Sequence, residues 1–96
     1  MRVLSLDKIE DCFDGTLMGE IRLDDEITEG LIRYLGEFGE LDYFPGFARP
    51  FFRIDMAELL MLKGIQGNRH MRIIFLRGKQ SQAESKLSEL LSRFAR

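Results

Sequence analysis

The residues most able to do chemistry are scarce in this sequence. His70 is the only histidine and Cys12 the only cysteine among 96 residues. A zinc site usually needs three or four such ligands, and a nucleophilic cysteine needs a base held by a third group. Acidic residues crowd the first quarter, but they lack the spacing of a calcium-binding loop. We therefore predict no catalytic residues, no metal site and no cofactor, with His70 on a strand surface and Cys12 a packed thiol.

One segment has the composition of a binding surface. Residues 43–53 hold five aromatic side chains and two arginines. Part of the aromatic set must enter the core, and the remainder is free to face a partner. Exposed aromatic rings with arginine are typical of interaction hot spots and of base-stacking platforms. The residues that we assign to partner binding are Phe44, Phe47, Arg49 and Arg53.

A second set of residues is basic. Lys63, Arg69, His70 and Arg72 lie close together in the sequence and are candidates for contacts with anions or nucleic acid. The formal net charge of −2 disfavours nucleic acid, because proteins that bind polyanions usually carry net positive charge.

The charges are unevenly distributed along the chain. Residues 1–48 contain 4 basic and 12 acidic residues, a net of −8, whereas residues 49–96 contain 10 and 4, a net of +6. If folding leaves the two halves on different surfaces, copies of the chain attract one another and form a weak, salt-sensitive homo-oligomer. If folding interleaves the halves, the charges neutralise each other across the surface.

Turn signals and alternation predict the strands that carry these residues. Asp14-Gly15 favours a hairpin between residues 8–13 and 16–23, with Asp11 opposite Met18. Residues 41–44 and 49–54 read as extended segments joined by a type II turn at Pro45-Gly46. Pro50 indicates an edge strand or the start of a strand.

Residues 55–63 have two interpretations. Asp55 and Glu58 resemble a capping box that would begin a short helix. The alternative is a strand that pairs with residues 69–75 through a turn at Gly67-Asn68. That hairpin register places Leu60, Leu62 and Gly64 opposite Phe75, Ile73 and Met71, which makes one face uniformly apolar or small, so we prefer it.

Two helices have clear apolar stripes. The first carries Ile27, Leu31, Tyr34, Leu35 and Phe38, with Asp24–Glu26 at its start and Gly39 at its end. The second carries Ala83, Leu87, Leu90, Leu91 and Phe94 after a capping box formed by Ser81 and Glu84.

These elements predict one α+β domain over residues 1–96, in the order ββαβββα. Two helices pack on one face of an antiparallel sheet of about five strands, and the other face is open. No apolar run approaches the roughly 20 residues that span a bilayer, so we expect no membrane partner. A single cysteine and the lack of a secretory signal favour the cytoplasm.

The leading functional hypothesis is a non-enzymatic module that binds a protein partner, whose identity is unknown, through the aromatic-arginine segment and the open sheet face. Binding of single-stranded nucleic acid on the basic sheet face is the first alternative. A small-ligand binder or an enzyme whose site leaves no sequence motif is the second.

Overall fold

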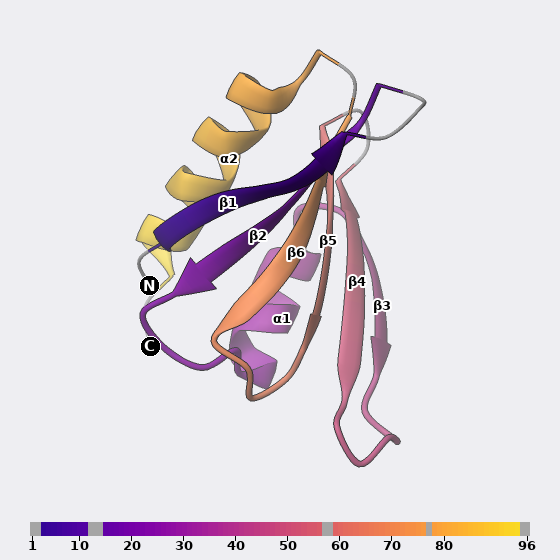
Figure 1. Ribbon diagram of the computed structural model, residues 1–96. Helices are drawn as coiled ribbons and strands as arrows, with labels where there is room; N and C mark the ends of the chain where they lie inside the picture. The colour runs from indigo at the N-terminus through magenta and orange to yellow at the C-terminus, as the bar shows by residue number, and fades with distance from the viewer. Residues whose placement is uncertain (1–2, 12–14, 57–58, 77, 95–96) are drawn as a thin grey trace.

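An antiparallel sheet forms one layer of the molecule, and both helices lie on the same side of it (Figure 1). The computed structural model describes residues 3–11, 15–56, 59–76 and 78–94. Six strands are hydrogen-bonded in the order β1-β2-β6-β5-β4-β3, one more than the sequence predicted. The elements are β1 (Val3–Asp11), β2 (Leu17–Leu23), α1 (Glu29–Gly36), β3 (Glu40–Phe44), β4 (Phe51–Met56), β5 (Leu60–Ile65), β6 (His70–Phe75) and α2 (Gln80–Arg93).

Strict alternation in the central strands separates the core from the exposed face of the sheet. In β4, Phe52, Ile54 and Met56 are buried, while Phe51 and Arg53 are exposed. The same alternation in β6 buries Met71, Ile73 and Phe75. The buried side chains of the strands join those of both helices in a single apolar cluster, as the predicted helix stripes require. Phe38 is the exception, because it follows the end of α1 and is exposed.

The β5–β6 hairpin has the register that the sequence predicted. Leu60 pairs with Phe75, Leu62 with Ile73 and Gly64 with Met71, so the helical alternative for residues 55–63 is wrong. Gly64 is needed there because a β-carbon at this position would lie 2.9 Å from two ring carbons of Phe52. The buried Phe52 ring occupies the space that a side chain on β5 would otherwise fill.

Two local predictions about the other strands are wrong. In the β1–β2 hairpin, Asp11 pairs with Leu17 rather than with Met18, and Asp14 and Cys12 lie outside the described residues. Gly46 lacks the positive φ that a type II turn requires, so a longer loop joins β3 and β4. Pro50 directly precedes Phe51, the first residue of β4, so its predicted position at the start of a strand is confirmed. The edge-strand alternative fails, because β4 is an interior strand and the edges are β1 and β3.

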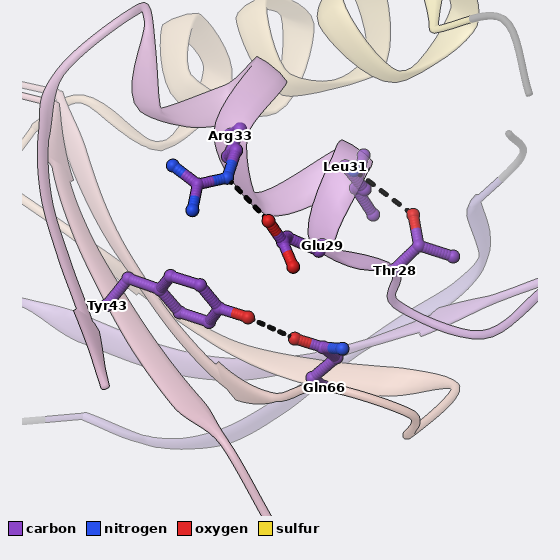
Figure 2. Close-up of polar contacts among 6 residues, drawn as sticks. All are labelled: Thr28, Glu29, Leu31, Arg33, Tyr43 and Gln66. Carbon is purple, nitrogen blue, oxygen red and sulfur yellow. Dashed lines mark hydrogen bonds and ion pairs between the residues drawn. The ribbon is translucent and has the colours of Figure 1, made fainter. Parts of the chain in front are cut away.

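The start of α1 also differs from the prediction. The helix is capped by Thr28, whose Oγ1 accepts a hydrogen bond from the Leu31 N–H at 3.1 Å (Figure 2). It therefore begins after Asp24–Glu26. The reason is tertiary: Ile27 donates to the Asn68 carbonyl and accepts from the Gly67 N–H, both at 2.8 Å. These bonds hold Ile27 against the β5–β6 turn and delay the first helical turn.

The second helix begins two residues earlier than a cap at Ser81 would allow. Lys79 is its N-cap residue and makes no capping bond through its side chain, so the capping box is wrong, whereas Ala83, Leu87, Leu90 and Leu91 are buried as predicted. The Tyr34 hydroxyl donates to the Leu90 carbonyl at 2.7 Å and joins the two helices. No helix in the described ranges is long and apolar enough to cross a membrane.

Candidate binding face

Three cations lie side by side across the middle of the open face, which is the face of the sheet opposite the helices. Lys63 of β5 pairs in register with Arg72 of β6 on one side and with Arg53 of β4 on the other. These three residues form the cation row. An acid lies opposite each end of the row, Glu20 beyond Arg72 and Asp42 beyond Arg53. The row is therefore a short positive band with a negative residue at both ends.

The charges in the cation row are unequally compensated. Arg53 forms an ion pair with Asp42 at 2.8 Å across the β3–β4 ladder. Arg72 directs one guanidinium nitrogen at the Met18 sulfur, 3.8 Å away. Within the described part of the chain, no acid lies at ion-pair distance from Lys63 or Arg72. Like charges directly opposite each other destabilise a sheet. The Lys63–Arg72 pair therefore lowers the stability of the folded protein.

Three exposed phenylalanines gather beside the cation row. Phe44 and Phe51 stack with ring centroids 4.5 Å apart, and the Phe47 ring lies 5.3 Å from Phe51 and 6.4 Å from Phe44. Their exposed fractions are 41%, 39% and 58% respectively. These rings form one contiguous patch, the phenylalanine cluster. Phe52, in contrast, is buried, so the aromatic segment is divided between core and surface as predicted.

The phenylalanine cluster lies one row along the strands from the cations. Phe44 pairs with Phe51, and Phe51 pairs with Ile65. Each of these strand residues is two positions from a residue of the charged row on its own strand, a distance of about 6.5–7 Å in a β-strand. The open face therefore presents an apolar row and a charged row side by side.

The two rows line a groove of about 690 Å³. The side chains that line it come from five strands and the β5–β6 turn. On the open face they are Glu20, Asp42, Phe44, Phe51, Arg53, Lys63, Ile65, Asn68, His70 and Arg72.

The β5–β6 turn supports the loop that carries Phe47. The Gln66 N–H donates to the Pro50 carbonyl at 2.8 Å, and the Gln66 side chain accepts a hydrogen bond from the Tyr43 hydroxyl (Figure 2). One guanidinium nitrogen of Arg49 donates to the Asn68 side-chain oxygen at 2.8 Å. These bonds tie the loop to a neighbouring hairpin, which restricts how far the phenylalanine cluster can move.

A further cation lies on the helix side of the molecule. Arg33 of α1 forms an ion pair with Glu29 at 2.8 Å, and this hydrogen bond and the charge of Glu29 raise the pKa of Arg33 (Figure 2). Its guanidinium lies 5.6 Å from the centre of the Tyr43 ring. Arg33 is thus already paired, in contrast to Lys63 and Arg72.

Most of the residues assigned from the sequence meet on the open face. Phe44, Arg53, Lys63, His70 and Arg72 line the groove, and Phe47 packs against its aromatic end. Arg49 touches the groove through Asn68 and acts in holding the loop. Arg69 lies in the turn, outside the groove lining, where its carbonyl accepts from the Leu23 N–H.

Sequence reasoning missed Phe51, Ile65, Asn68, Glu20 and Asp42. The alternation of β4 was a usable signal for Phe51, because it places Phe51 and Arg53 on one face. Glu20 reaches the row only through the pairing of β2 with β6, which connects distant parts of the sequence. In the described ranges, no three His, Cys, Asp or Glu side chains come together as metal ligands.

Comparison with protein-family models, with curated proteins and with solved structures found no match for this chain. Its function has to follow from the geometry of its own residues.

Proposed function

We propose that this chain is a protein-interaction domain that binds a partner protein on its open face. The observation that carries the proposal is the phenylalanine cluster, three neighbouring rings that are each 39–58% exposed. Single exposed apolar residues are ordinary, whereas a contiguous exposed patch marks an interaction site. Aromatic anchors with arginine at their border are also the usual composition of the residues that dominate binding energy.

Single-stranded nucleic acid is the second candidate, and the cation row favours it. Two features count against it. The faces of Phe44 and Phe51 stack on each other at an interplanar angle of 23°, so these faces are not both free for bases. Glu20 and Asp42 lie opposite the ends of the row, where a phosphate chain that continues past three cations would meet negative charge.

A small anionic ligand is supported only by the size of the groove. About 690 Å³ falls within the range of about 300–1,000 Å³ typical of ligand sites. Such sites bury most of the ligand, however, whereas Arg53, Lys63 and Arg72 are exposed on the surface of a sheet. A partner protein that covers the open face would contact both the apolar row and the charged row, and it therefore explains their exposure better than a small ligand does.

The cellular location that we propose is the cytoplasm. The support is compositional: a single cysteine allows no disulfide within the chain, which suits a reducing compartment. Subcellular fractionation of a tagged protein tests this, and recovery in a secreted fraction would contradict it.

Affinity capture from a lysate tests the interaction function with three forms of the protein: wild type, Phe47→Ala and Phe38→Ala. Phe38 is the matched control, because it is 42% exposed and lies near Lys86 on the helix side. Truncating an anchor at a hot spot costs about 2 kcal/mol or more, roughly a thirtyfold loss of affinity.

We expect wild type and Phe38→Ala to recover the same proteins, and Phe47→Ala to lose at least one of them. Thermal melts of all three forms show that the loss is not due to unfolding. Recovery of an identical set by all three forms would contradict the proposed face.

A further inference from the structure

We infer that the open face recognises an extended segment of its partner in which an acidic side chain and an aromatic or large aliphatic side chain are two residues apart. This inference rests on the proposed function and names the chemistry of the partner. It follows from the distribution of charge in the cation row and from the distance between the two rows.

The acidic side chain is specified by Lys63 and Arg72. These two cations lie opposite each other on β5 and β6. Glu20 is the register partner of Arg72 on β2, but no described acid lies at ion-pair distance from Lys63 or Arg72. Arg53, in contrast, is already paired with Asp42. A carboxylate above Lys63 and Arg72 accepts charge-assisted hydrogen bonds from both and removes their mutual repulsion. The unpaired end of the row therefore selects a single negative group.

The apolar side chain is specified by the neighbouring row. Ile65 follows Lys63 by two residues on β5 and pairs with Phe51 of the phenylalanine cluster. An extended peptide has the same spacing, because its residues i and i+2 point to one side about 6.5–7 Å apart. A segment that lies along β5 therefore places its acid over Lys63 and Arg72 and its apolar side chain against Ile65 and Phe51. The residue between them points away from the sheet.

The short length of the positive band favours a peptide over a polyanion. One carboxylate needs only the two unpaired cations, whereas a nucleic-acid strand presents successive phosphates along its length. Those phosphates would meet Glu20 at one end of the row and Asp42 at the other. Charge complementarity thus favours a partner that presents a single acidic side chain over one that presents a chain of phosphates.

Titration of the ¹⁵N-labelled protein, followed by the amide shifts in NMR spectra, tests this inference. The probes are nine-residue synthetic peptides of glycine and serine that contain glutamate and phenylalanine two residues apart, in either order. Matched peptides replace glutamate by glutamine or phenylalanine by alanine. A decathymidylate is the nucleic-acid probe. The protein variants are Lys63→Gln and Arg72→Gln, with Arg93→Gln as the charge-matched control, since Arg93 pairs with Glu89 on α2.

We expect a glutamate-phenylalanine peptide to shift the amides of β4, β5 and β6. Replacing its glutamate by glutamine weakens binding about tenfold, as do Lys63→Gln and Arg72→Gln, because each loses a charge-assisted hydrogen bond. Arg93→Gln binds like wild type, and replacing the phenylalanine by alanine also weakens binding.

Four results overturn the inference in different ways. If the glutamine and glutamate peptides bind with equal affinity, the face binds apolar segments regardless of their charge. That result refutes the inference but not the proposed interaction function. Tighter binding of decathymidylate at the same amides overturns both proposals in favour of nucleic acid. Shifts that appear when only unlabelled protein is added identify a second copy as the occupant. Absence of shifts with every peptide at millimolar concentration also refutes the inference, while the capture experiment judges the proposed function independently.

Discussion

Lys63→Glu should make the protein more stable, because Lys63 lies directly between two other cations. The substitution turns two opposed like-charge pairs, with Arg72 and with Arg53, into two opposite-charge pairs. A cross-strand charge pair contributes about 0.2–1 kcal/mol, and exposed pairs belong in the lower part of that range. Two converted pairs should therefore raise the free energy of unfolding by about 1 kcal/mol. For a domain of this size, that corresponds to an increase in Tm of about 4–8 °C.

Urea and thermal unfolding at low salt measure this effect, with Lys63→Gln as the control that has nearly the same shape as glutamate but no charge. Lys63→Gln should gain less than Lys63→Glu. The difference between them should shrink in 1 M NaCl, where the Debye length is about 3 Å. If Lys63→Glu is no more stable than Lys63→Gln at low salt, the side chains of the cation row do not repel one another and the reasoning fails. The Lys63→Glu protein should also no longer bind the acidic peptide. Lys63 would then be a residue that serves binding and lowers stability.

Three further changes test the fold by urea unfolding. Gly64→Ala should destabilise by about 1–3 kcal/mol, because the new β-carbon would lie 2.9 Å from the Phe52 ring; wild-type stability would show that the ring can move aside. Thr28→Ala should cost about 1 kcal/mol through the lost N-cap, and an unchanged midpoint contradicts that role. Deletion of residues 80–96 removes four buried side chains of α2 and should abolish cooperative unfolding; a truncated chain that still unfolds cooperatively refutes it.

Local patterns were sufficient for the hairpin at the centre of the site. The register from Leu60 to Phe75 followed from the requirement that one face of β5 and β6 be apolar. The helix stripes were equally informative, because each helix buries one side against the sheet. The α+β class and the open face follow from these two observations together.

Helix starts and the full set of site residues needed contacts that sequence patterns do not report. Acids before α1 suggested an early start, but hydrogen bonds from Ile27 to the β5–β6 turn moved the cap to Thr28. The order of the strands depends on β2 pairing with β6, across about 50 residues of sequence. Without knowledge of that pairing, one could not predict that Glu20 lies opposite Arg72 and limits the positive band at that end.

The alternation in β4, β5 and β6 has a consequence for how this molecule changes over evolutionary time. One set of positions, which includes Phe52, Ile54 and Ile73, forms the core and determines the fold. The positions between them form the exposed surface. A substitution at Arg53 or Lys63 therefore changes the exterior without altering the volume of the interior. Homologous chains can diverge at the exposed positions, and so acquire new binding preferences, while they keep the same scaffold.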